Sequence, residues 1–168
     1  DFSIRIFKAG LHCRLFPGAW VYHKRRTDFR KFWRQVFNSG IARINLYKKY
    51  PDSLKLVHLL PMVFTLGVIF LALLFIDGLL TCLFSASSDA SSWGLDAMEL
   101  ALAPLILYSL LIFADSARQN HSMKIGLLSV RAAFTQLMGY GCGFLQAWWR
   151  RCVRGQDEFA AYEKNFYK

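Results

Sequence analysis

The distribution of apolar and cationic residues divides the chain into three parts. No Lys or Arg lies between Lys55 and Arg118, although both residue types are frequent on either side of this gap. The gap contains two apolar runs, Leu59 to Ile76 and Leu100 to Ala114. A bilayer core about 30 Å thick requires roughly 20 mostly apolar helical residues to cross it. The pattern therefore predicts a helical hairpin in a membrane, rather than two core helices of a water-soluble domain.

The two runs define a first span over residues 58–84 and a second over residues 97–115. Asp77 is expected near the far headgroups or against a partner helix, and Glu99 at the interface. The loop between them, residues 85–96, carries two Asp and no cation. Because Lys and Arg are retained on the cytoplasmic side, this loop is predicted to be exterior and both ends of the chain cytoplasmic.

A third apolar stretch, residues 123–154, is predicted to lie on the inner face of the membrane. Arg131 would cost roughly 3 kcal/mol at membrane depth, and the glycines within 139–143 weaken the middle of a helix. A full crossing would also place the basic residues at its end outside, against the positive-inside bias. We therefore expect amphipathic or re-entrant helices hinged at these glycines, with a third span as the alternative, followed by a cytoplasmic tail at 155–168.

Residues 27–50 have the spacing of an amphipathic helix, which Thr27 or Asp28 would cap. Such a helix can lie in a membrane interface, where each cation near anionic lipid contributes about 1 kcal/mol. The alternative is a packed helix with a solvated basic face; the short distance to the first span favours the interface. The apolar side comprises Phe29, Phe32, Trp33, Val36, Phe37, Ile41, Ile44 and Tyr47.

Residues 1–26 show the pattern of a short helix followed by two strands. Phe2 to Lys8 is predicted to be helical, with Gly10 as its C-cap. Alternating apolar residues from Leu11 onward predict a strand, a turn at Pro17-Gly18 and a second strand ending at His23. The segment before the first span is marginal for an independent core. We therefore expect it to complete a domain whose greater part lies upstream.

Composition and charge agree with this division. Hydrophobic residues form 55% of the chain and aromatic residues 16%, above the values of an ordinary soluble domain, and the formal net charge is +10. Lipid and topology account for cations beside a membrane hairpin, so no nucleic-acid partner is expected. The four cysteines lack metal-ligand spacing and are expected to be reduced structural thiols. The sequence contains no Gly-rich phosphate loop, serine elbow or zinc motif.

An ordered set of residues in the first 50 positions resembles the end of the catalytic domain of membrane-associated family 2 glycosyltransferases. In that family an acidic cluster is followed by D-hydrophobic-x-x-R, a Gly, a Pro-containing strand, V-x-H and R-Q-x-x-x-x-G-x-x-R. The two spans and the basic tail are similar to the membrane anchor of bacterial members. The matching residues are Asp1, Arg5, Gly10, Pro17, His23, Arg34, Gln35, Gly40 and Arg43.

The resemblance implies a mainly α membrane protein. Residues 1–26 would be the end of a GT-A (α/β) catalytic domain, followed by the interfacial helix, two transmembrane helices and the amphipathic or re-entrant region. The implied activity is sugar transfer from a nucleotide-sugar donor to a glycan or lipid-linked acceptor at the cytoplasmic face of a bacterial inner membrane. The donor-binding half, the Asp-x-Asp motif and the catalytic base would precede Asp1, which matches the last acid of the cluster. The base is therefore unknown, and we expect this chain alone to be inactive.

The resemblance also implies four site residues and a divalent metal, Mg or Mn. His23 is the candidate metal ligand, and its alternative is a surface histidine at a strand end. Arg34 and Gln35 point about 100° apart on a helix, so one can face a phosphate or acceptor while the other supports it. Both would also serve as interface residues. Arg5 can bind substrate or pair with the acidic cluster.

Two other functions remain open from the sequence. The first is a catalytically silent membrane anchor or partner-binding module. The second is a small transporter subunit, which would require polar residues along a path through the spans. Asp77 alone is weak support for such a path.

Overall fold

The computed structural model describes residues 2–22, 28–85 and 87–156, and within these ranges the chain is helical without a β-strand. Two 3₁₀ turns, η1 (Pro51–Ser53) and η2 (Leu56–His58), connect α2 to α3. A π-helical turn, η3 (Trp149–Val153), extends α5. The α-helices are α1 (Phe2–Lys8), α2 (Phe29–Lys49), α3 (Leu60–Phe84), α4 (Ser88–Asn120) and α5 (Met123–Trp148).

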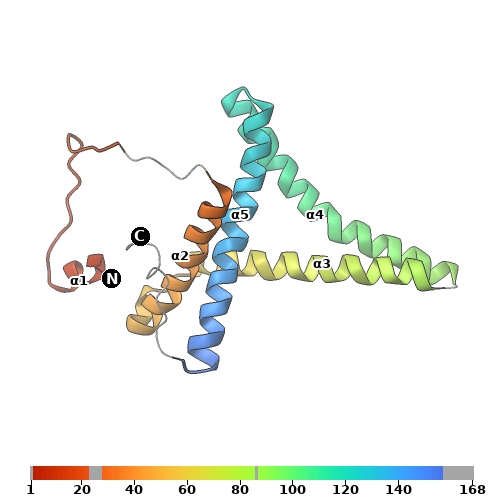
Figure 1. Cartoon of the computed structure of the whole chain (residues 1–168), viewed down its shortest axis with the longest axis horizontal. Coiled ribbons are helices and arrows are strands. Elements are labelled where there is room, and N and C mark those ends of the chain that lie inside the picture. The colour runs from red at the N-terminus through yellow and green to blue at the C-terminus, as the bar shows by residue number, and fades with distance from the viewer. Residues whose placement is uncertain (1, 23–27, 86, 157–168) are drawn as a thin grey trace.

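Helices α2 and α5 lie side by side and run in the same direction (Figure 1). At the N-terminal end of α2 the guanidinium of Arg131, from the first half of α5, lies over the Phe29 ring, 4.3 Å from its centroid. At their C-terminal ends Arg151 donates to Oδ1 of Asn45 at 2.8 Å. Helix α3 projects away from this pair, and α4 returns from the tip of the α3–α4 hairpin to the N-terminal end of α5.

Helix α2 begins at a polar cap and buries the middle of its apolar stripe. The Asp28 carboxylate accepts the N–H of Arg30 at 2.8 Å, which confirms Asp28 as the predicted N-cap. Ile41 and Ile44 form a buried cluster with Phe144 and Ala147 of α5. Part of the stripe is therefore used for helix packing, as in the alternative of a packed helix with a basic outer face.

Helix α5 runs without interruption through residues 139–143, so the predicted hinge is wrong. A Cβ added at Gly143 would collide with the backbone carbonyl oxygen of Phe37 in α2. A Cβ at Gly141 would collide with Oγ1 of Thr65 in α3. These glycines allow the backbones of neighbouring helices to approach closely, the role that small residues have in membrane helix pairs.

Small residues also join α3 to α4 near the hairpin tip. A Cβ at Gly78 would lie 2.6 Å from the carbonyl oxygen of Gly94, and a Cβ at Gly94 would lie 2.7 Å from that of Gly78. One turn further towards the tip, Sγ of Cys82 lies 3.5 Å from the carbonyl oxygen of Ser91. The two helices are therefore in backbone contact here, antiparallel and in a fixed register.

Three aromatic rings connect α3, α4 and α5 further from the tip. Phe64 lies 5.3 Å from Tyr108 and 5.7 Å from Phe134, and Tyr108 lies 5.5 Å from Phe134, between ring centroids. These spacings fall within the range of favourable edge-to-face pairs, each contributing about 0.5–1.5 kcal/mol beyond burial. Helix α5 thus packs against both members of the hairpin.

A tight turn joins α4 to α5. His121 adopts the left-handed conformation with φ of 49° and ends α4, and the Ser122 side chain caps α5 by accepting the N–H of Ile125. The hydroxyls of Ser116 and Ser129 lie 2.7 Å apart across the two helices. Helices α4 and α5 are therefore antiparallel neighbours.

The predicted strands are not formed in residues 11–22. The turn at Pro17-Gly18 is present, with Ala19 N–H donating to the Phe16 carbonyl at 3.0 Å, but no strand pairing flanks it. A two-stranded hairpin is only marginally stable without further strands or a packing face. The alternation of apolar residues was therefore not enough to predict strands here. The expected GT-A (α/β) character of residues 1–26 is therefore not supported. Helix α1 and its end at Gly10, with φ of 73°, agree with the prediction.

The segment 85–96, expected to be an exterior loop, is largely helical because α4 begins at Ser88. Asp89 lies in the first turn, where a negative charge favours the helix N-terminus. Gly94 and Ala97 are buried against α3, so packing stabilises this part of α4. A polar, Ser-rich composition is compatible with both an exposed loop and an exposed helix end, which is why the sequence pattern wrongly predicted a loop.

Substitution of Gly143 by Ala is expected to destabilise the fold by about 1–3 kcal/mol, because the methyl group would overpack against the Phe37 backbone. Gly67→Ala is the matched control, since nothing lies within 4 Å of a Cβ there. The control should be neutral or gain up to about 1 kcal/mol of helix propensity. Thermal unfolding in detergent micelles measures both variants, and equal midpoints would contradict the close contact.

Candidate functional site

The α3–α4 hairpin presents an apolar surface that the rest of the chain does not cover. Both helices are long and apolar enough to cross a membrane, and only 6% of the most apolar part of α3 and 11% of that of α4 are buried. A core helix of a soluble domain would be mostly buried, and apolar surfaces this extensive mark sites of contact with membranes or other proteins. On α3 the large exposed residues include Leu66, Ile69, Phe70, Leu73 and Ile76, and on α4 Leu100, Leu102, Ile106, Leu107, Leu110 and Leu111.

Acidic residues lie near the hairpin tip. Asp77 of α3 and Asp96 of α4 are exposed, and the Gly78–Gly94 contact places them at about the same height. The exposed Glu99 lies three residues further from the tip on α4. Below this level, residues 60–76 of α3 are uncharged and span about 25 Å at the helical rise. This length approaches the hydrocarbon thickness of a bilayer, about 30 Å. The tip beyond Asp77 would project past the hydrocarbon.

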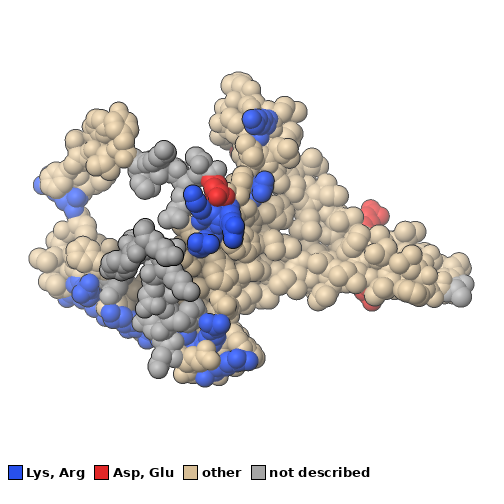
Figure 2. All heavy atoms as spheres, in the orientation of Figure 1, with Lys and Arg blue, Asp and Glu red and all other residues tan. Residues whose placement is uncertain are grey.

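Cations gather at the opposite end of the hairpin, over α1, α2 and the end of α5. In the face drawn in Figure 2, Lys and Arg cover this end and also appear where α4 meets α5, whereas the part of the hairpin towards its tip shows two small acidic patches and no cation. Trp148 and Trp149 are about half exposed beside this region, as expected of aromatic residues at a headgroup interface. We call this region the basic platform; its exposed cations include Arg30, Lys31, Arg34, Lys48, Arg150 and Arg154.

The structure does not gather the predicted substrate-binding residues into one place. Arg34 and Gln35 are exposed in the N-terminal half of α2. Arg5 is exposed on α1, and α1 contacts the other end of α2, where Lys8 lies over the Tyr50 ring at 4.6 Å. The predicted metal ligand, His23, lies outside the described residues.

The described part of the chain has no group of three or more His, Cys, Asp or Glu side chains able to hold a metal ion. The residues placed by the structure therefore do not themselves form the Mg or Mn site that the family resemblance implies. We therefore assign no metal-dependent reaction step to these described residues.

Two arginines at the C-terminal ends of α2 and α5 have buried guanidinium nitrogens. The Nε atoms of Arg43 and Arg151 are buried and have no hydrogen-bond partner, although Arg151 also donates to Asn45. A buried cationic donor without an acceptor is costly. Sequence reasoning placed Arg43 in the family motif and expected a basic outer face there, and the structure instead packs it partly inside.

The four cysteines are free thiols, as expected from their spacing. Burial raises the pKa of the Cys142 thiol on α5, which disfavours the reactive thiolate. Cys13 and Cys152 are exposed. A role as inert structural thiol therefore fits Cys142 best.

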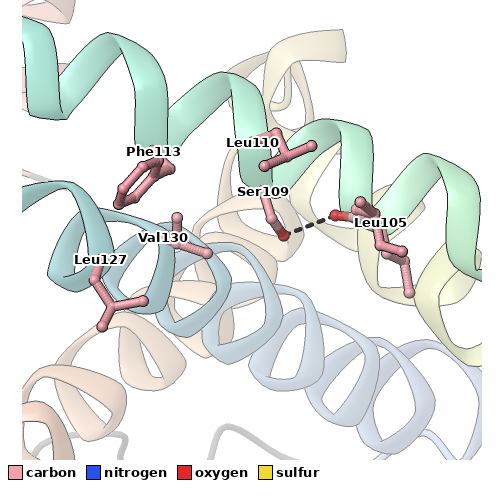
Figure 3. Close-up of a pocket in the computed structure, with 7 residues that line it drawn as sticks. Leu105, Ser109, Leu110, Phe113, Leu127 and Val130 are labelled. Atoms are coloured by element: carbon pink, nitrogen blue, oxygen red, sulfur yellow. Dashed lines mark hydrogen bonds between the residues drawn. The ribbon is translucent and has the colours of Figure 1, made fainter. Parts of the chain in front are cut away.

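An apolar groove of about 350 Å³ lies between α4 and α5 and is open along one side. In Figure 3 the ring of Phe113 points from α4 towards α5, at the end of the groove nearest the α4–α5 turn. Sequence reasoning missed this groove because it depends on the angle at which two helices separate. We call it the α4–α5 groove; its lining comprises Leu105, Ile106, Ser109, Leu110, Phe113, Leu127 and Val130.

Comparison of the chain with protein-family models, with curated proteins and with solved structures finds no match. The functional interpretation therefore depends on the apolar hairpin, the basic platform and the residues on α2.

Replacing Leu66 by Lys is expected to impair membrane insertion, because this exposed residue lies in the middle of the uncharged part of α3 and a charge at membrane depth costs roughly 3 kcal/mol. Leu83→Lys is the matched control, since Leu83 is also exposed on α3 but lies beyond the level of Asp77. The fraction of protein that resists alkaline carbonate extraction reports insertion. Equal extraction of the two variants would contradict the assigned depth.

Proposed function

We propose that the chain is the membrane-bound C-terminal part of a family 2 glycosyltransferase. It would transfer a sugar from a nucleotide-sugar donor to a glycan or lipid-linked acceptor at the cytoplasmic face of a bacterial inner membrane. The main support for this proposal is the position of α2, the helix that contains the motif R-Q-x-x-x-x-G-x-x-R. It lies at the base of a hairpin of two exposed, apolar helices. A divalent metal, Mg or Mn, with His23 as candidate ligand, is part of this proposal by resemblance.

The exposures of the motif residues on α2 support a division of roles. Gly40 is buried, and a Cβ there would collide with the Tyr140 carbonyl oxygen of α5, so we assign it to helix packing. Arg34 and Gln35 face outward and are free of this packing. A guanidinium can bind a phosphate oxygen through charge-assisted hydrogen bonds. We therefore assign Arg34 to the donor diphosphate or acceptor, and Gln35 to its support.

The charge distribution supports the orientation of this proposal. With the hairpin across the bilayer, the basic platform lies on one side and the acidic tip on the other. Because cations are retained on the cytoplasmic side, the platform and both ends of the chain would be cytoplasmic. Anionic lipid headgroups would be its partner on that surface.

A catalytically silent membrane anchor or partner-binding module is the second candidate. The observation that favours it is the separation of Arg5 from Arg34 and Gln35, since no single constellation of the expected site residues forms among the residues that the structure places. An anchor would require only the hairpin and the basic platform.

Sugar transfer tests the proposal and distinguishes the two candidates. Membranes containing the protein as its cell makes it should incorporate sugar from a panel of labelled nucleotide-sugar donors. Arg34→Ala and Gln35→Ala should each lower the rate about ten-fold or more, the effect of removing a hydrogen bond that stabilises transition-state charge. Lys31→Ala, an exposed cation on the same helix, is the matched control and should retain activity.

Rates in the Arg34 and Gln35 variants equal to that of the Lys31 control would contradict their assigned roles. A wild-type protein that transfers sugar from no donor would favour the silent anchor instead.

Cysteine labelling should show the tip and the platform on opposite sides of the membrane. In a background with all four native cysteines replaced by Ser, we expect a membrane-impermeant maleimide to label Ser88→Cys in intact cells with a permeabilised outer envelope. Cys152, retained alone, should react only after the inner membrane is opened, because it lies on the platform. Labelling of both positions from one side would contradict the crossing.

A further inference from the structure

The α4–α5 groove has no part in the proposed sugar transfer, and its lining has the chemistry of a hydrocarbon site. Six of the lining residues have purely apolar side chains. The one hydroxyl of the lining, on Ser109, donates to the Leu105 carbonyl within α4 at 2.7 Å (Figure 3). The groove walls therefore present no polar side chain that is left to orient a polar ligand. Apolar surface of this kind is stabilised by contact with hydrocarbon rather than water.

The groove is continuous with the exposed apolar surface of the hairpin. Ile106, Leu110 and Leu127 are 52%, 57% and 67% exposed, so the lining opens outward. From Leu105 to Phe113 the groove follows about 12 Å of α4 at the helical rise, within the uncharged part of that helix. A hydrocarbon chain in a bilayer can therefore enter from the side without crossing a polar surface.

One end of the groove is cationic. Arg118 and Lys124 are exposed at the α4–α5 turn, and Lys124 precedes Leu127 by three residues, on the same side of α5. Cations are visible at this end of the molecule in Figure 2. The nearby acid, Asp115, accepts two hydrogen bonds from Gln119 at 2.9 Å. A fitting ligand thus has a hydrocarbon chain and an anionic head.

We propose that the α4–α5 groove binds one acyl chain of an anionic phospholipid, with its phosphate beside Lys124. The inference rests on the proposed crossing of the membrane by α3 and α4, but not on sugar transfer. A second copy of this chain is a poorer occupant, because two chains with a net charge of +10 would meet at a cationic rim. A bound chain would fill the angle between α4 and α5 and hold the two helices together.

Photocrosslinking of lipid to the full chain in nanodiscs tests the proposal. The probe is phosphatidylglycerol with a diazirine in its acyl chain, diluted in phosphatidylcholine, and mass spectrometry maps the adducts. Groove residues should be labelled several-fold more than Leu107 and Leu111, which are exposed on α4 outside the lining. Val130→Trp should fill the groove and lower its labelling several-fold, whereas Leu107→Trp, the matched control, should leave it unchanged.

A second variant tests the anionic head. Lys124→Gln should lower the preference for labelled phosphatidylglycerol over labelled phosphatidylcholine roughly five-fold, the equivalent of about 1 kcal/mol for one cation near an anionic headgroup. An unchanged preference would overturn the assigned phosphate contact.

The remaining outcomes separate this inference from the proposed function. Even labelling around α4 would overturn the groove site while leaving the membrane span intact. An absence of labelling on both α3 and α4 would overturn the span itself. A groove shielded from lipid, with Ser109→Cys forming a disulfide between copies, would show that a second chain occupies it and would overturn the lipid site.

Discussion

The close approach of helix backbones at the glycines of α5 is the constraint on which the rest of the structure depends. Gly143 meets the backbone of α2, and Gly141 meets Thr65 of α3, so α5 is held on two sides at nearly the same height. Within a bilayer there is no hydrophobic driving force between helices, and association depends on van der Waals packing and interhelical hydrogen bonds. Glycines allow the closest van der Waals packing between helices. Thr65 contributes an interhelical hydrogen bond, because its hydroxyl donates to the Pro61 carbonyl at 2.8 Å and also lies 3.4 Å from the Leu137 carbonyl of α5.

This packing also sets how α2 is presented. Gly40 and Ile44 turn one side of α2 towards α5, and the exposed cations consequently occupy the other side. The position of Arg34 and Gln35 relative to the α3–α4 hairpin therefore depends on the packing of α2 against α5. A chemical site at the membrane surface would depend on helix packing several residues away from it.

Much of the helical architecture could be predicted from local patterns. The cation-free run indicated the hairpin, and the apolar stripe indicated α2. Residue type identified Gly10 as a helix end and left Thr27 and Asp28 as alternatives for the cap of α2, of which the structure uses Asp28. The continuity of α5 could not be predicted, because the glycines at 139–143 weaken an isolated helix and become favourable only beside α2 and α3, which lie about 75 to 105 residues earlier in the chain. Local alternation in residues 11–22 likewise could not reveal whether a partner strand exists.

The candidate site was less predictable than the fold, for a related reason. The exposure of Arg34 followed from the amphipathic pattern, but its separation from Arg5 depends on where α1 contacts α2. The partial burial of Arg43 depends on packing that no local pattern encodes. The α4–α5 groove arises from the angle between two helices, which the sequence of neither helix specifies.

The parallel pairing of α2 and α5 has a consequence for the order of assembly during synthesis. Asn45 and Arg151 are 106 residues apart in the chain, so the whole hairpin is made between the two helices that pack together. At about 5–20 residues per second, α2 leaves the ribosome roughly 5–20 s before its partner. During that interval the apolar stripe of α2 lacks its partner helix α5, and under the proposed membrane crossing a lipid surface would be within reach as a temporary contact. The nascent chain would then exchange lipid for protein when α5 arrives, so the final step of folding would be a transfer of α2 rather than its formation.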